Sequence, residues 1–123
     1  MNLLLDTHII LWWLDDDPLL SEKYRQAVSD TENVCLVSAA SIWEISIKSA
    51  IGKLEIPKNY IGILKEQGFF ELPVLWEHAD KARHLPFHHT DPFDRMLVAQ
   101  AMIDGLTILT IDKTIPQYKV QIL

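Results

Sequence analysis

The sequence has a single cysteine and lacks any long hydrophobic run. Cys35 cannot form a disulfide within the chain, and its place in the apolar run 34–37 predicts a small core side chain. The apolar stretches are far too short to cross a membrane, and no basic region precedes Asp6, so we expect neither a membrane span nor a signal peptide. These absences favour a reducing, cytoplasmic setting.

Basic residues are also in the minority. The chain has 17 acidic and 11 basic side chains, and its formal net charge is −6. A broad nucleic-acid-binding surface is normally basic, so this balance argues against one. It remains compatible with a small acidic site that meets phosphate groups through a bound metal ion.

Several common catalytic motifs are missing. We find no P-loop, no G-x-G-x-x-G turn, no G-x-S-x-G elbow and no H-E-x-x-H helix. With one cysteine and no such helix, a closed zinc site at His88 and His89 is disfavoured. We interpret the two histidines as loop residues and leave open a position near a substrate.

What the chain does contain is an alternation of strand and helix patterns. Its 123 residues predict one domain, residues 1–123. The apolar run Leu3–Leu5 is typical of a strand buried on both faces. We predict strands at 2–6, 33–37, 69–73 and 107–111, a possible short strand within 120–123, and helices at 7–15, 21–30, 39–51, 58–67, 76–84 and 92–104. This order predicts a three-layer α/β/α fold with a central parallel sheet of about four to five strands.

Acidic residues stand where the predicted strands end. Asp6 and Asp112 each follow an apolar strand directly. Asp94 lies in the first turn of the helix that leads to strand 107–111, and Glu44 lies about a turn into the helix after strand 33–37. Parallel strands end, and their crossover helices begin, at one edge of the sheet. We therefore expect all four carboxylates to converge at that edge.

Four like charges at one place repel each other strongly and need a compensating charge. Mg²⁺ and Mn²⁺ take oxygen ligands and are typically held by carboxylates together with substrate phosphate. Such a cation makes water a better nucleophile and stabilises charge on phosphoryl oxygens. The pattern therefore favours metal-dependent hydrolysis of a phosphodiester, with Asp6, Glu44, Asp94 and Asp112 as the metal-binding and catalytic residues.

Two of these acids have clear structural alternatives. Asp6 could cap the helix that follows it. Glu44 could pair with Lys48 four residues later, or complete a capping box with Ser41. We favour a functional role for both, since one shared site would explain all four acids.

The residues around Asp94 also have open roles. Asp91 and the following Pro92 match a helix start, so we interpret Asp91 mainly as the N-cap. Asp94 could serve only as a favourable charge in the first turn of that helix, and Asp112 could simply start a turn. Arg95 could contact a phosphate or form a surface ion pair.

The resemblance to a known family rests on four segments: Leu3–His8, Ser41–Glu44, Asp91–Ala101 and Leu109–Asp112. In this order and spacing they resemble a PIN domain and, more narrowly, the VapC-like toxins of bacterial type II toxin–antitoxin systems. The resemblance covers nearly the whole chain, and the run Asp-Pro-Phe-Asp-Arg-x-Leu-x-Ala-Gln-Ala is its most specific part.

This resemblance implies a parallel sheet flanked by helices and a Mg²⁺- or Mn²⁺-dependent ribonuclease. The four acids of the family correspond to Asp6, Glu44, Asp94 and Asp112, and Thr110 matches the small polar residue that often accompanies the last acid. The resemblance also implies an RNA substrate, a homodimer, and an antitoxin from the neighbouring gene that inserts a segment near the active site.

Two other classes of function remain open. A receiver-type signalling domain also gathers aspartates around Mg²⁺, but strand 33–37 ends without an acid, which argues against it. A non-catalytic interaction module is the other class. Ile9, Trp12 and Trp13 give helix 7–15 more apolar surface than one buried face needs.

Overall fold

The computed structural model describes residues 1–123, and its centre is a sheet of five parallel strands. The strands are β1 (Asn2–Leu5), β2 (Val34–Ser38), β3 (Phe70–Leu72), β4 (Thr107–Leu109) and β5 (Gln121–Ile122). They lie in the order β3-β2-β1-β4-β5, and each neighbouring pair is parallel. The predicted sheet is confirmed, including the short last strand, and β1 is its central strand.

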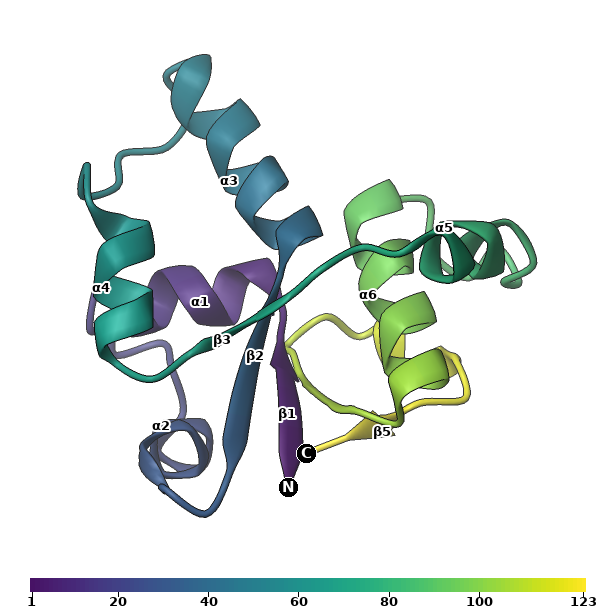
Figure 1. Cartoon of the computed structure of the whole chain (residues 1–123), viewed down its shortest axis with the longest axis horizontal. Coiled ribbons are helices and arrows are strands. Elements are labelled where there is room, and N and C mark those ends of the chain that lie inside the picture. The colour runs from purple at the N-terminus through teal and green to yellow at the C-terminus, as the bar shows by residue number, and fades with distance from the viewer.

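Helices cover both faces of this sheet. They are α1 (Thr7–Leu14), α2 (Glu22–Ser29), α3 (Ala39–Ala50), α4 (Tyr60–Glu66), α5 (Trp76–Arg83) and α6 (Pro92–Asp104). Helices α1, α2 and α4 lie on one side of the sheet, and α5 and α6 on the other (Figure 1). The six predicted helices are confirmed, and the 3-10 helix Ile115–Gln117 is an addition that the sequence pattern does not predict. None of the helices has the length and hydropathy that a membrane crossing requires.

Strand β1 is buried on both faces. Leu3, Leu4 and Leu5 each have 0% of their surface exposed. Leu3 and Leu5 pack into the core on the α1 side, and Leu4 packs into the core on the α6 side. Successive side chains of a strand point to opposite faces, so three adjacent leucines supply both cores. Cys35 is buried in the first of these cores, as predicted.

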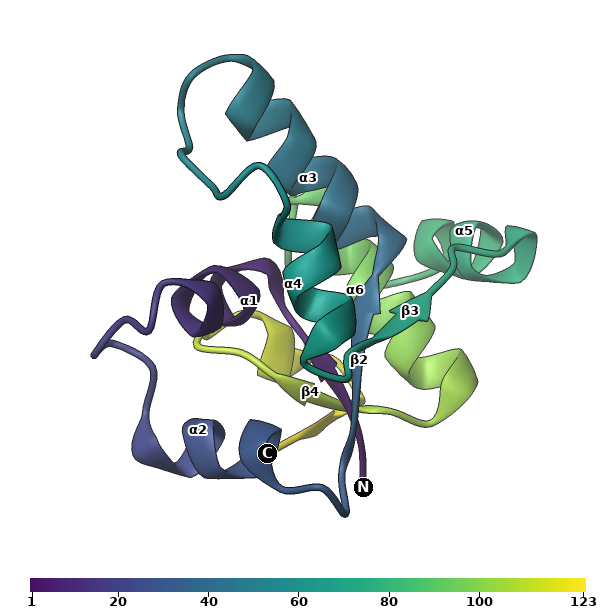
Figure 2. The same cartoon turned by 60° about the vertical axis from the view of Figure 1, so that its left-hand side comes forward.

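Helices α1, α3 and α6 begin at the edge of the sheet where β1 and β2 end (Figure 1). Each begins with a side-chain cap, because Asp6, Ser38 and Asp91 accept hydrogen bonds from backbone N–H groups of the first turn. Helix α6 ends at Gly105, whose φ of 67° is a left-handed conformation that glycine adopts easily. Figure 2 shows that α3 extends well beyond the sheet.

Gln100 joins three parts of the fold at the same edge. It is fully buried in α6, and the Ser38 hydroxyl donates a hydrogen bond to its Oε1 at 2.6 Å. Its Nε2 donates to the carbonyl oxygen of Pro73 at 3.1 Å. The amide therefore ties α6 to the end of β2 and to the segment after β3.

The apolar surface of α1 is largely covered. Ile9 has 0% exposure, and Trp12 and Trp13 pack half-buried against the adjoining core. The Trp13 indole N–H donates to Gln67 Oε1 at 2.7 Å, and its ring meets Phe69 edge-on at 6.1 Å. The end of α4 and the turn after it therefore cover Trp13, and a partner surface on the rest of α1 stays a prediction.

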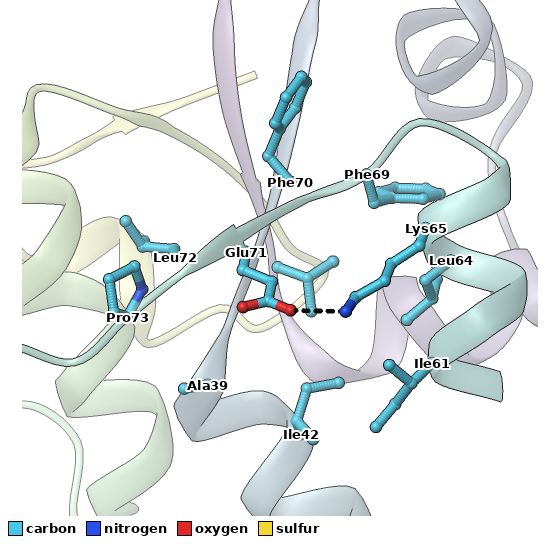
Figure 3. A pocket seen from close by; sticks show the side chains of 11 residues that line it. Ala39, Ile42, Ile61, Leu64, Lys65, Phe69, Phe70, Glu71, Leu72 and Pro73 are labelled. Carbon is cyan, nitrogen blue, oxygen red and sulfur yellow. Dashed lines mark ion pairs between the residues drawn. The ribbon is translucent and has the colours of Figure 1, made fainter. Parts of the chain in front are cut away.

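An apolar groove of about 280 Å³ lies between the edge strand β3 and helices α3 and α4 (Figure 3). Eight of its eleven lining residues are hydrophobic, and Phe70 and Ile61 are among them. Lys65 Nζ and Glu71 Oε1 form an ion pair there at 3.1 Å. Glu71 is the one acidic residue among those that line the groove.

Candidate metal centre

Asp6 lies at the end of the central strand and is 2% exposed. Its Oδ1 accepts the N–H of Ile9 at 3.0 Å, so it does cap α1, and its Oδ2 accepts the hydroxyl of Thr110. Burial raises the pKa of Asp6, although the hydrogen bonds from Thr110 and Ile9 oppose that rise. The structural alternative is thus realised, but a helix cap alone does not require a carboxylate buried this deeply.

Thr110 links Asp6 to the acid after β4. Its hydroxyl oxygen accepts the backbone N–H of Asp112 at 2.9 Å while it donates to Asp6. Strands β1 and β4 are neighbours, with Leu5 paired to Leu109, so their ends lie side by side. The small polar residue expected from the resemblance therefore joins the two strand-end acids.

Asp94 and Asp112 meet at His89. The Nε2 atom of His89 lies 2.9 Å from Asp112 Oδ2 and 3.0 Å from Asp94 Oδ2. Ligand atoms of these three residues all lie within 4.8 Å of one another. The structure thus brings together an acid at the start of α6 and an acid after the next element, β4, as the shared edge of the sheet predicts.

The two neighbouring acids carry their charge unequally. Burial, the nearby Asp91 charge and, more weakly, Asp6 and Asp112 raise the pKa of Asp94 to about 7, although His89 opposes the rise. Burial would also raise the pKa of Asp112. Hydrogen bonds from His89 and from the backbone N–H groups of Thr114 and Ile115 outweigh that effect and lower it. The charge of Asp94 is therefore the less compensated of the two.

One family model matches almost the whole chain, from residue 3 to residue 121, and it describes the PIN domain. The chain belongs to the PIN domain family. PIN domains are nucleases and generally use divalent metal ions. The resemblance read from the sequence is thereby confirmed at the level of the family, and the receiver-type alternative is wrong. No curated protein sequence matches the chain.

Solved structures share this PIN fold over nearly the full chain. One is VapBC2 from Rickettsia felis, solved with a DNA fragment of its promoter. Its TM-score is 0.73 at 13% sequence identity, and the match covers 100% of this chain and 97% of that chain. FitAcB from Neisseria gonorrhoeae has a TM-score of 0.65 at 19% sequence identity, and the match covers 98% of this chain and 96% of that chain. The PIN domain endonuclease Utp24 has a TM-score of 0.54 and 19% identity, covering 94% and 74%. At such identities the likeness concerns the fold.

The donor set of this PIN domain fits a hard divalent cation. Asp94 and Asp112 offer carboxylate oxygens within one small volume, and Asp6 is near enough for its charge to raise the pKa of Asp94. Carboxylate oxygens are the protein ligands that Mg²⁺ and Mn²⁺ prefer. The raised pKa of Asp94 marks negative charge that lacks a partner, and a cation would supply that partner.

Glu44 is buried on α3, but its contact is with a lysine. Its Oε2 lies 2.9 Å from Lys48 Nζ, one helical turn later, and 8% of the Glu44 side chain is exposed. It is not among the residues whose ligand atoms cluster with those of Asp94. The i,i+4 pair that the sequence offers as an alternative is therefore present, and any role of Glu44 toward a cation stays a prediction.

Arg95 has neither of the roles proposed for it from the sequence. The residue is only 7% exposed, and its guanidinium donates to the carbonyl oxygens of Pro86 and Ala82, each at 2.8 Å. It also stacks over the ring of Phe87, with 4.3 Å between the guanidinium carbon and the ring centroid. Phosphate contact and a surface ion pair are both wrong, because the planar guanidinium holds the loop between α5 and α6.

The other residues of this loop differ in whether they contact the acids of the candidate metal centre. Asp91 is the N-cap of α6, as predicted, with its Oδ1 accepting the N–H groups of Phe93 at 2.8 Å and Asp94 at 3.2 Å. His88 packs edge-on against Tyr118, with ring centroids 4.9 Å apart. Both histidines are loop residues, but only His89 contacts the acids. Its position five residues before Asp94 is the one signal in the sequence that could have suggested this.

Proposed function

We propose that this PIN domain is a divalent-metal-dependent ribonuclease, and that it is the toxin of a toxin–antitoxin pair. The observation that carries the proposal is the buried Asp6 beside the cluster of Asp94 and Asp112, at the edge where β1 and β4 end. Family membership supports phosphodiester hydrolysis, and the similarity to Utp24, a PIN domain endonuclease, agrees with it. RNA as the substrate is supported by the resemblance to VapC-like toxins.

In this proposal, Asp6, Asp94 and Asp112 hold Mg²⁺ or Mn²⁺, directly or through water. The bound cation supplies a more acidic water and stabilises negative charge on the phosphoryl group. Thr110 and the N–H of Ile9 fix the carboxylate of Asp6. Backbone N–H groups of Thr114, at 2.6 Å, and Ile115, at 3.3 Å, fix that of Asp112. The acids are thus oriented by the fold itself.

We also propose a contribution from Glu44, either to cation binding or to the position of the attacking water. Its burial near the beginning of α3, which starts at the same edge as the other acids, supports this role. Lys48 would then balance the charge of Glu44 and hold the carboxylate in place. Glu44→Gln should lower the rate of RNA cleavage strongly. An unchanged rate would show that Glu44 serves only to pair with Lys48 in the wild-type protein.

The decisive experiment is RNA cleavage by wild type and Asp6→Asn, each with Mg²⁺ or Mn²⁺ and with EDTA. Wild type should cleave only with the metal. Asp6→Asn should lose at least about a hundredfold in rate while it stays folded, because asparagine also caps helices well. Asp15→Asn, which changes an exposed acid at the end of α1, is the matched control and should keep full activity. Full metal-dependent cleavage by Asp6→Asn would exclude Asp6 from the site.

For its partners, we propose an antitoxin and a second copy of this chain. The similarity to VapBC2 and FitAcB supports a protein partner, and the homodimer is supported by the resemblance to VapC-like toxins. An antitoxin would keep the nuclease harmless until it is removed, which the toxin role requires.

A further inference from the structure

His89 occupies a position between two acids that no part of the proposed mechanism explains. Its Nε2 forms a hydrogen bond with Asp112 Oδ2 at 2.9 Å and lies 3.0 Å from Asp94 Oδ2. We propose that His89 is a positioning residue of the metal centre, whose Nε2–H holds the carboxylates of Asp94 and Asp112 side by side without itself binding the cation. This inference rests on the proposed metal-dependent activity.

The neighbouring backbone decides that His89 donates at Nε2. The N–H of Asp91 donates a hydrogen bond to His89 Nδ1 at 3.1 Å, so Nδ1 presents its lone pair there. A ring whose Nδ1 accepts an N–H carries its own hydrogen on Nε2. His89 therefore donates to Asp112 from Nε2.

The same contact opposes a role for His89 as a metal ligand. A ring that binds a cation through Nε2 must carry its hydrogen on Nδ1, where it normally donates to an oxygen. In this structure Nδ1 faces the N–H of Asp91, so the ring would place one donor against another. A cation at Asp94 and Asp112 therefore meets carboxylate oxygens, with the imidazole behind them.

The backbone of His89 is held firmly enough for such a role. Its N–H donates to the Tyr118 hydroxyl at 2.9 Å, and its carbonyl oxygen accepts Arg95 Nη1 at 3.4 Å. The buried guanidinium of Arg95 also donates to the Tyr118 hydroxyl, at 3.2 Å. Arg95 and Tyr118 thus fix the backbone that carries the imidazole.

The orientation of the Asp94 carboxylate depends on His89 more strongly than the orientation of the Asp112 carboxylate does. Asp112 Oδ1 accepts two backbone N–H groups, from Thr114 and Ile115, whereas the one polar group in contact with the Asp94 carboxylate is the imidazole. Without His89, two carboxylates whose oxygens lie within 4.8 Å would repel, and Asp94 would be free to turn away. A hydrogen bond to a residue that holds a metal ion is typically worth about 10–100-fold in metal affinity.

The proposal is tested by titrating Mn²⁺ into the protein without RNA, using isothermal calorimetry. His89→Leu should weaken Mn²⁺ binding at least about tenfold, because it removes the donor. His89→Gln, which keeps an N–H donor at a similar reach, should stay within about threefold of wild type. His88→Leu is the matched control on the same loop and should bind as wild type does. Equal affinities for wild type and His89→Leu would overturn the positioning role.

Nitrogen-15 NMR of the histidine rings in wild type tests the donor role directly, with a loop variant needed only to assign the signals. The His89 signals, identified by their loss in His89→Gln, should show hydrogen on Nε2 both before and after Mg²⁺ saturation. Loss of that hydrogen when Mg²⁺ binds would make His89 a ligand and overturn the proposal. Failure of wild type to bind either cation would overturn the metal-dependent function as well, whereas unchanged binding in His89→Leu would overturn this inference alone.

Discussion

Single side chains in this PIN domain combine structural hydrogen bonds with a place in the candidate metal centre. Asp6 caps α1 with one oxygen and turns the other toward Thr110. Asp112 starts the turn after β4 through two backbone N–H groups and also contacts His89. Local hydrogen bonds therefore do not argue against a functional role, since they are what orients each carboxylate.

The unequal pKa values of Asp94 and Asp112 predict opposite effects of two similar substitutions. The pKa of Asp94 in the folded, metal-free protein is about 7 against an ordinary value of 3.8. The contribution of Asp94 to the stability of the protein therefore falls as pH rises from about 4 to about 7. Asp94→Asn should therefore stabilise the metal-free protein at pH 8, by about 1 kcal/mol after allowance for solvent screening, and have little effect near pH 4.

Asp112→Asn is the matched comparison, because the pKa of Asp112 is lowered in the folded protein. A lowered pKa means that the charged form contributes stability above the ordinary value, and this contribution is lost as pH falls below it. This variant should consequently be less stable than wild type at pH 8. Thermal unfolding of the three proteins in EDTA between pH 4 and pH 8 measures both effects, and a change of the same sign in both variants would contradict the unequal charges.

Among the elements, α6 carries much of the organisation around the candidate metal centre. Its first turn presents Asp94, and the residue after it, Arg95, anchors the preceding loop. Further along, Gln100 ties the helix to β2 and to the segment after β3. One helix thus fixes an acid, the loop that carries His89, and the packing of the edge from which the acids project.

Gln100→Leu should destabilise the fold by about 2 kcal/mol, because it leaves the carbonyl of Pro73 and the buried Ser38 hydroxyl without their partner. Urea unfolding measures the change in the free energy of unfolding. Gln26→Leu, at an exposed position on α2, should change it by less than about 0.5 kcal/mol. Equal stability of the two variants would show that the amide bridge contributes little.

At the scale of the whole molecule, the cluster of acidic side chains and the exposed apolar surface lie at separate places. The acids meet at the strand ends, whereas the apolar groove of Figure 3 lies beside the edge strand β3. Exposed apolar side chains also occur on α3, where 65% of Trp43 and 39% of Ile47 are accessible. With a net charge of −6, the proposed nuclease would meet an RNA substrate through the cation rather than through a broad basic surface.

The proposed assembly predicts a defined result when the chain is expressed with the product of its neighbouring gene. The two proteins should elute together, and the complex should cleave RNA more slowly than the separated chain, since an antitoxin has to block the site. The separated chain should have twice its monomer mass by light scattering. Elution as a monomer would exclude the homodimer, and a neighbouring product that neither binds nor inhibits would exclude it as the antitoxin.

Much of the fold follows from patterns that are local in the sequence. Three adjacent leucines specify a strand buried on both faces, and Asp91 with Pro92 specifies where α6 begins. Because β-α-β crossovers have a fixed hand, the alternation of elements also predicts that Asp6, Asp94 and Asp112 share one edge. The spacing of apolar residues acts within each segment, and the hand of a β-α-β crossover is the same in nearly all proteins. Both can therefore be used before the folded structure is known.

Only the tertiary structure decides which partner each polar side chain takes. Arg95 reads as an exposed residue beside Asp94, yet it is buried against backbone carbonyls of a loop that precedes it. His89 reads as a loop residue, and only the folded chain brings it to Asp112, 23 positions later. Hydrogen bonds depend on distance and direction in space, and these follow from how all the elements pack together.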